Sequence, residues 1–193
     1  MRRAKHNADV ALDDIDIRRD VVDRLNQLEI AYYVTGSEAM AMHGIAYRQT
    51  NDTDFMLAIG PADYEARLRP AFEPEYLVND LEAHPPRWLG SAIHTRSIGK
   101  ADFIVRESGS WANEAFARRM LLEDPLLGPI WVATLEDLLL AKLEWSDGRL
   151  DGLQGRDARA IAGGPVALDI AYVRRQAASL GIGPLVEKVL GDA

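Results

Sequence analysis

The sequence predicts an α/β or α+β fold in which a sheet domain is followed by a helical C-terminal part. Up to about residue 133, apolar residues switch repeatedly between helical spacing and strand spacing, and from residue 134 onward they keep helical spacing alone. Interleaved helices and strands are typical of layered architectures with a sheet at their centre. With 193 residues, the chain is long enough to bury a core of ordinary size.

The first elements lead to a short glycine-serine turn. Residues 1–14 mix charged and small side chains without an apolar period, so we expect a loose lead-in. Residues 17–28 have apolar positions at helical spacing and predict a helix. The short β-branched run 30–35 predicts a buried strand that ends at Gly36-Ser37. The following segment predicts a helix over residues 38–43, ended by Gly44.

A second group of elements contains further strands. Residues 50–59 alternate and then become wholly apolar, as in a strand that enters a sheet core. Pro61 opens a predicted helix over residues 61–72, and Pro70 and Pro74 limit its far end. Residues 76–86 have no clear period. Two runs, 91–96 and 101–105, predict a hairpin.

The remaining chain is mostly helical. We expect a helix over residues 111–122, a short strand at 130–132, and a strong amphipathic helix over 135–145 with Thr134 as its cap and Asp137 in the capping-box position. A polar loop, 147–155, precedes about three short helices separated by glycine-proline segments. The sequence therefore predicts a lead-in (1–14), a sheet domain (15–133) and a helical region packed on it (134–193).

Composition excludes several classes of protein. The chain has no cysteine, which rules out disulfides and zinc–thiolate sites and fits a reducing compartment, so we expect a cytoplasmic protein. No apolar run approaches the length of a membrane span, and we expect no membrane partner. The net charge of −8 argues against a surface that holds nucleic acid by bulk electrostatics.

Three aspartates form a candidate metal site. Asp52 and Asp54 flank one residue of a predicted strand, so both carboxylates project from the same face. Neighbouring carboxylates repel each other unless a cation lies between them, and oxygen ligands suit Mg²⁺. Asp102 begins an apolar run as the other two begin theirs, which makes it the candidate third ligand. Alone, an Asp-x-Asp pattern is more often a pair of solvated acids.

Gly36-Ser37 is a candidate phosphate site. It lies where a predicted strand meets a helix N-terminus, and unpaired backbone N–H groups there favour an anion. Glycine lets the backbone approach closely, and serine adds a hydroxyl donor. An ordinary turn with a serine N-cap explains the same two residues when they are taken alone.

Four motifs in this order resemble the DNA polymerase β-like nucleotidyltransferase superfamily. They are YVTGSEAMAMHG (33–44), RQTNDTDFML (48–57), ADFIV (101–105), and VATLEDLLLAKLE (132–144) followed by GRD (155–157). The likeness is greatest to minimal nucleotidyltransferases related to the AbiEii toxins of bacterial toxin–antitoxin systems. Thr53 departs from the pattern, since an aliphatic residue is usual there.

The resemblance implies a fold, a reaction and ligands. The fold would be a nucleotidyltransferase fold, a mixed β-sheet flanked by helices with the aspartates at one edge. A hydroxyl would attack the α-phosphate of a nucleoside triphosphate (NTP), with Mg²⁺ or Mn²⁺ held by the three aspartates and with Asp102 helping to deprotonate the acceptor. Gly36-Ser37 would hold the β- and γ-phosphates. The acceptor would be tRNA or a protein, and a cognate antitoxin would be a partner.

Two basic residues and one ion pair have open roles. Lys142 either points toward the triphosphate or is a solvated lysine. Arg48 either neutralises Asp52 or contacts phosphate. Arg156 and Asp157 favour a structural ion pair.

Other functions also stay open. One alternative to an active enzyme is a catalytically inactive nucleotide-binding or interaction module on the same fold. A second is a plain α/β scaffold with solvated carboxylates. His43 favours a packing role over catalysis.

Overall fold

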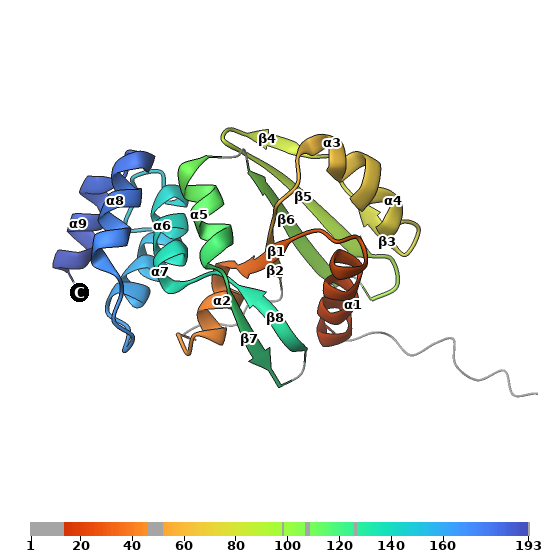
Figure 1. Cartoon of the computed structure of the whole chain (residues 1–193), viewed down its shortest axis with the longest axis horizontal. Helices are drawn as coiled ribbons and strands as arrows, with labels where there is room; N and C mark the ends of the chain where they lie inside the picture. Colours follow the sequence, from red (N-terminus) through yellow and green to blue (C-terminus); the bar gives the residue numbers. More distant parts are fainter. Residues whose placement is uncertain (1–13, 46–51, 98, 107–108, 126, 193) are drawn as a thin grey trace, which may run out of the picture.

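The computed structural model describes residues 14–45, 52–97, 99–106, 109–125 and 127–192. Helices and strands interleave up to β8, and only helices follow it, as the sequence predicts. Figure 1 shows the C-terminal helices gathered at one end of the molecule, with the sheet extending away from them. Within these ranges, no helix combines the length and the apolar character that crossing a membrane would require.

The described strands form one mixed sheet with the order β3-β5-β6-β2-β1-β8-β7, in which β4 pairs with β5. β2 is parallel to β6 and β1 is parallel to β8, whereas the other pairs are antiparallel. The bounds are β1 Tyr32–Thr35, β2 Thr53–Leu57, β3 Tyr76–Val78, β4 Glu82–His84, β5 Arg87–His94, β6 Lys100–Arg106, β7 Met120–Asp124 and β8 Gly128–Val132. The predicted mixed sheet flanked by helices is confirmed.

The helices of the first half flank this sheet. The first two are α1 Asp14–Gln27 and α2 Gly36–Met42, joined by an ion pair of 2.7 Å between Arg18 Nη1 and Glu38 Oε1. α2 begins at Gly36, two residues earlier than predicted. His43, just after α2, has its Nε2 2.7 Å from the carbonyl oxygen of Ala133, which fits the expected packing role.

The helix predicted over residues 61–72 is divided into three consecutive segments. They are α3 Pro61–Asp63, a π-helical turn η1 Tyr64–Leu68, and α4 Arg69–Phe72. Pro70 lacks a backbone N–H, so it cannot donate the usual bond to the carbonyl four residues earlier. The π-helical turn lies directly before the segment that contains this proline.

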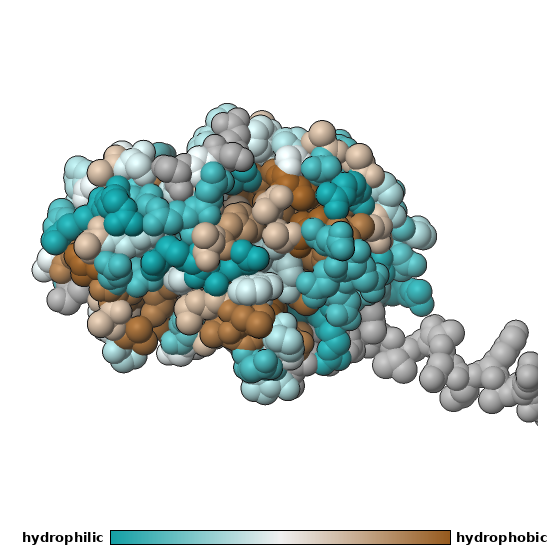
Figure 2. All heavy atoms as spheres, in the orientation of Figure 1, coloured by the Kyte–Doolittle hydropathy of each residue, from teal (hydrophilic) through white to brown (hydrophobic). Residues whose placement is uncertain are grey.

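The predicted helix over residues 111–122 is wrong at its C-terminal end. α5 covers Ser110–Arg118, and Met120 already belongs to β7, which pairs with β8 along its whole length. Pairing with a distant strand outweighs the local helical pattern here. β7 is an edge strand whose Met120 and Leu121 side chains are exposed, and hydrophobic surface is visible over the β7–β8 region in Figure 2.

The helical tail agrees closely with the sequence prediction. α6 covers Leu135–Trp145, and Thr134 caps it by accepting a hydrogen bond from the backbone N–H of Asp137. Three helices follow, α7 Leu153–Ala162, α8 Ile170–Leu180 and α9 Gly183–Gly191. The loop predicted over residues 147–155 is shorter than expected, because α7 begins at Leu153.

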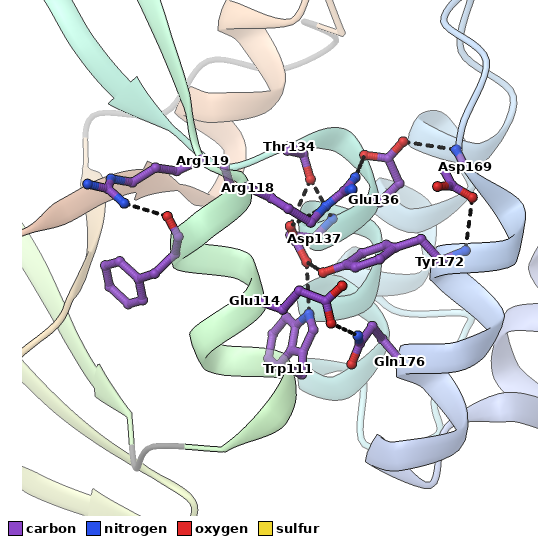
Figure 3. Close-up of polar contacts among 12 residues, drawn as sticks. Trp111, Glu114, Arg118, Arg119, Thr134, Glu136, Asp137, Asp169, Tyr172 and Gln176 are labelled. Atoms are coloured by element: carbon purple, nitrogen blue, oxygen red, sulfur yellow. Dashed lines mark hydrogen bonds and ion pairs between the residues drawn. The ribbon is translucent and has the colours of Figure 1, made fainter.

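A buried polar network joins α5, α6 and α8 (Figure 3). The Asp137 carboxylate accepts hydrogen bonds from Trp111 Nε1 at 2.9 Å, Tyr172 Oη at 2.6 Å and Thr134 Oγ1 at 2.8 Å. The Arg118 guanidinium lies over the Tyr172 ring, 3.9 Å from its centroid, and 3.8 Å from Asp137 Oδ2. Each donor satisfies part of a charge that burial would otherwise penalise. The predicted capping residue Asp137 therefore also connects three helices through its hydrogen bonds.

Candidate functional site

Asp54 and Asp102 lie side by side on neighbouring strands. β2 and β6 run parallel, and their register pairs Asp54 with Asp102. Register partners in adjacent strands are about 5 Å apart and project from the same face. Burial, and next the Asp102 carboxylate, raise the pKa of Asp54 to about 6. The fold thus holds two carboxylates close enough to repel each other.

Gly36 lies against Asp54 on the side away from Asp102. Thr35, at the end of β1, is the register partner of Asp54, and Gly36 follows it with a φ of +67°. A β-carbon on Gly36 would overlap the Asp54 carboxylate. The glycine therefore serves two needs, a left-handed backbone and room for a carboxylate group.

Asp52 contributes charge from an exposed position just before β2. Its carboxylate acts electrostatically on Asp54 and raises the pKa of that group further. In the part of the chain that the structure describes, no three His, Cys, Asp or Glu side chains gather closely enough to hold a metal ion together. The structure thus brings Asp54 and Asp102 together, and leaves Asp52 at the margin of the pair.

Lys142 is buried in an ion pair with Asp157. The distance from Lys142 Nζ to Asp157 Oδ2 is 2.6 Å, and the two side chains are 9% and 0% exposed. Arg156 and Asp157 were predicted to form a structural ion pair. Asp157 does belong to such a pair, but its partner is Lys142 of α6, whereas Arg156 is exposed. Lys142 is not a solvated lysine either. Its ammonium still acts on Asp54, whose pKa it lowers in opposition to burial.

A cavity of about 320 Å³ lies over the paired carboxylates. Its floor has two rows across β2, β6 and β5: a polar row of Asp54, Asp102 and Ser91, and an apolar row of Met56, Ile104 and Leu89. All of these except Ser91 line the cavity. One row is therefore suited to a cation, and the next row to an apolar group.

One face of α6 forms the opposite wall. Leu138, Ala141, Lys142 and Trp145 line the cavity, and their spacing of three, four and seven residues places them on a single helical stripe. Gln154 of α7 also lines it. The buried pair Lys142–Asp157 joins α6 to α7, so it holds the two helices of this wall together.

Lys100 is a further residue of the site, which the sequence motifs do not include. It is the first residue of β6, and its Nζ lies 2.8 Å from Oδ1 and 2.9 Å from Oδ2 of Asp102. A signal was available, because residues two apart on a strand share a face. Ser37 is half-buried in α2, and Arg48 lies outside the described residues.

The donor set fits a hard divalent cation. Asp54 and Asp102 offer carboxylate oxygens only, and Mg²⁺ is usually held by one or two carboxylates together with water and substrate phosphates. The repulsion between the two groups is what a cation between them would relieve. The contact with Lys100 shows that a positive charge is accommodated at Asp102.

Comparisons with known proteins support the fold. No family profile and no curated protein matches the chain. Two solved structures of the antibiotic-resistance factor ANT(2'')-Ia are similar to this chain. The first has a TM-score of 0.55 at 16% identity, and the match covers 86% of this chain and 91% of that chain. The second has a TM-score of 0.56 at 15% identity, and the match covers 86% of this chain and 97% of that chain. The second was determined with adenylyl-2''-tobramycin.

A nucleotidyltransferase-like protein from Paracoccidioides brasiliensis is also similar. Its TM-score is 0.52 at 15% identity, with 92% of each chain covered. The chain therefore has the nucleotidyltransferase fold, as the sequence motifs imply.

Proposed function

We propose that this chain is a metal-dependent nucleotidyltransferase that moves a nucleoside monophosphate from an NTP to an acceptor hydroxyl. The acceptor oxygen bonds to the α-phosphorus, the bond from that phosphorus to the bridging oxygen of the β-phosphate breaks, and pyrophosphate leaves. The observation that carries the proposal is the in-register pair Asp54–Asp102 on the floor of a cavity beside Gly36.

Asp54 and Asp102 would hold Mg²⁺ or Mn²⁺, with Asp52 adding charge at the margin. When bound, the metal supplies neutralisation of the phosphate charges and orients the transferred phosphoryl group. Asp102 is partly exposed, so it is the carboxylate that an acceptor hydroxyl can reach to pass on its proton.

Positive and polar groups around the carboxylates would hold the triphosphate. Gly36-Ser37 would take the β- and γ-phosphates, as in the family that the motifs resemble. Lys142 lines the cavity and keeps its ammonium near Asp54, so it adds positive potential without moving from Asp157. Arg48 precedes the carboxylates in sequence and would contact phosphate or Asp52.

The motifs, the cavity and the net charge each bear on the identity of the acceptor. The AbiEii-like motifs support tRNA or protein as acceptor, with a toxin role and a cognate antitoxin. The cavity supports a compact acceptor with an apolar face, because Leu89, Ile104 and Trp145 line it. The net charge of −8 weakens the support for an RNA acceptor, since RNA binding depends on neutralised phosphates.

A second candidate is an inactive nucleotide-binding module on the same fold. The observation that favours it is the Lys100 ammonium, which contacts both carboxylate oxygens of Asp102. A module of this kind would bind the triphosphate and leave it intact. It differs from the enzyme in a single measurable respect, the release of pyrophosphate.

The test is a transfer assay with matched variants. The protein is incubated with each of the four α-labelled NTPs and Mg²⁺ or Mn²⁺, in separate arms that contain tRNA, cell protein, or aminoglycosides and other small hydroxyl compounds. We expect label transfer in one arm, with its loss in Asp54→Asn and Asp102→Asn. Asp63→Asn, an exposed acid of α3, is the control and should keep full activity.

Two results would overturn the enzymatic proposal. Label transfer that persists in Asp54→Asn and Asp102→Asn would mean that the carboxylate pair is not the active centre. Metal-dependent NTP binding without pyrophosphate release in any arm would favour the inactive module.

A further inference from the structure

We propose that Lys100 is a positioning residue that holds Asp102 in the metal-free protein, so that the centre takes a divalent cation well only together with the triphosphate. This inference rests on the proposed function. It concerns how the metal enters, and it gives Lys100 a role that the sequence motifs do not include.

The contact between Lys100 and Asp102 uses both oxygens of the carboxylate. Lys100 Nζ lies 2.8 Å from Oδ1 and 2.9 Å from Oδ2, and the two side chains are 37% and 27% exposed. These are the same oxygens that a metal ligated by Asp102 would require. A metal ion and the ammonium therefore compete for one carboxylate.

Register places Lys100 among all three aspartates. Thr53 pairs with Ala101, and Asp54 pairs with Asp102, so Asp52 and Lys100 each precede the Thr53–Ala101 pair by one residue. The charges of Asp52 and Asp54 also act on the Lys100 ammonium. Lys100 thus lies where two parallel strands begin, beside the pair Asp54–Asp102 and with Asp52 at its margin, and the formal charge of these four groups is −2 in place of −3.

The cost of displacing Lys100 differs between a metal ion alone and a metal–triphosphate complex. A lone ion must displace Lys100 from Asp102, and the ammonium then remains close to the ion with no new anion to contact. A metal–triphosphate complex brings phosphate oxygens of its own, which are good acceptors for a flexible ammonium. The cost of displacement is therefore offset only when the nucleotide arrives with the metal.

Removal of Lys100 should make the site more open to metal alone. A partly exposed ion pair is a modest interaction, so we expect Mn²⁺ to bind Lys100→Met about 10-fold more tightly than wild type without nucleotide. The gain should require Asp102, because that carboxylate is the group that the substitution releases.

The experiment titrates Mn²⁺ alone and Mn²⁺ with a non-hydrolysable nucleoside triphosphate, with free Mn²⁺ followed by electron paramagnetic resonance. Wild type is compared with Lys100→Met, Lys100→Gln and Lys100→Arg, and with Lys188→Met, which removes an exposed positive charge on α9. We expect tighter binding in the Met and Gln variants, and wild-type affinity in the Arg variant and in Lys188→Met. The pair Asp102→Asn and Lys100→Met/Asp102→Asn should bind Mn²⁺ equally weakly.

Equal Mn²⁺ affinity in wild type, Lys100→Met and Lys100→Gln would overturn the inference. Weaker binding of the metal–triphosphate complex, with unchanged binding of metal alone, would also overturn it and would make Lys100 a phosphate ligand only. Tighter Mn²⁺ binding by Lys100→Met without label transfer by any protein would leave this inference standing and refute the transfer reaction. An absence of Mn²⁺ binding with or without triphosphate in every protein would refute both.

Discussion

The carboxylate of Asp54 lies against Gly36, and no other residue type can occupy that position without displacing it. A β-carbon at Gly36 would overlap Asp54, and the backbone φ of +67° is strained for any L side chain. The end of β1 and the acidic pair on β2 and β6 are therefore packed as one unit. This relationship explains why the glycine and the aspartate belong to the same site.

Gly36→Ala should destabilise the protein more than the same substitution at another glycine with positive φ. We expect a loss of about 3 kcal/mol in the free energy of unfolding, from backbone strain together with the overlap. Gly44→Ala is the matched control, because Gly44 has a φ of +79° and nothing lies near its missing β-carbon. That variant should lose only the strain, about 1–2 kcal/mol. Urea denaturation of both variants measures the difference.

A double-mutant cycle separates the overlap from other effects. In an Asp54→Gly background, Gly36→Ala should cost no more than Gly44→Ala does, because the carboxylate is no longer there. Equal costs for Gly36→Ala with and without Asp54 would contradict the packing described here.

The buried pair Lys142–Asp157 should be costly to break from one side. Lys142→Met or Asp157→Leu alone removes the ion-pair partner of a buried charge, and we expect each to lose about 3–5 kcal/mol. The double variant should recover most of this loss, since an apolar pair carries no desolvation penalty. Urea midpoints provide the measurement.

Arg174–Glu187 is the control for this pair, with the same kind of contact at 2.7 Å on side chains that are more than half exposed. Arg174→Met should shift the midpoint far less. A double variant of Lys142 and Asp157 that is as unstable as the sum of its singles would argue against the paired charges as the cause.

The metal-free protein should gain stability from Asp54 as the pH falls. The pKa of Asp54 is raised to about 6, above the value of about 3.9 for an unperturbed aspartate. The folded state therefore takes up the proton at a higher pH than the unfolded state does. The gain develops as the pH falls through 6, is complete below about 4, and has an upper limit of about 3 kcal/mol.

Unfolding free energies of wild type and Asp54→Asn, measured with a chelator between pH 7.5 and 4.5, isolate this contribution. Asp54→Asn should be the more stable protein at pH 7.5, and the advantage should shrink toward pH 4.5. Parallel pH profiles for the two proteins would show that Asp54 titrates normally.

Tyr172→Phe should weaken the junction between α5, α6 and α8. Tyr172 Oη donates to Asp137 at 2.6 Å, and a hydrogen bond to a charged group contributes about 1.5–3 kcal/mol. The Phe ring keeps the contact with Arg118, so the variant tests the hydroxyl alone. Thermal unfolding monitored by circular dichroism measures the effect. An unchanged midpoint would show that the hydrogen bond from Tyr172 to Asp137 does not stabilise the junction.

Local signals predicted much of this fold. The bounds and the cap of α6 follow from helical period and capping chemistry, and the pairing of β5 with β6 follows from two runs separated by a short turn. Leu121 and Leu122 show where such signals fail. Their apolar pattern continues that of a helix, and only pairing with β8, a non-local interaction, makes them a strand.

The carboxylates of the site were predictable from the sequence, but the side chains packed around them were not. Asp54 and Asp102 could be placed on neighbouring strands because each begins an apolar run, and the register confirms that they are adjacent. The partner of Lys142 could not be found from spacing, because Asp157 reaches it through the packing of α7 on α6. The α6 stripe that lines the cavity was equally hidden, since its residues look like ordinary core positions.

Asp54 and Asp102 together should hold a divalent metal with a nucleoside triphosphate. Titration calorimetry of wild type, Asp54→Asn, Asp102→Asn and Asp63→Asn with a non-hydrolysable NTP, in Mn²⁺ and in a chelator, measures this directly. We expect binding by wild type and Asp63→Asn that depends on Mn²⁺, and a loss of affinity of about 10-fold or more in the other two. Binding that survives the chelator, or that Asp54→Asn and Asp102→Asn retain in full, would show that the nucleotide is not held through a metal on these two carboxylates.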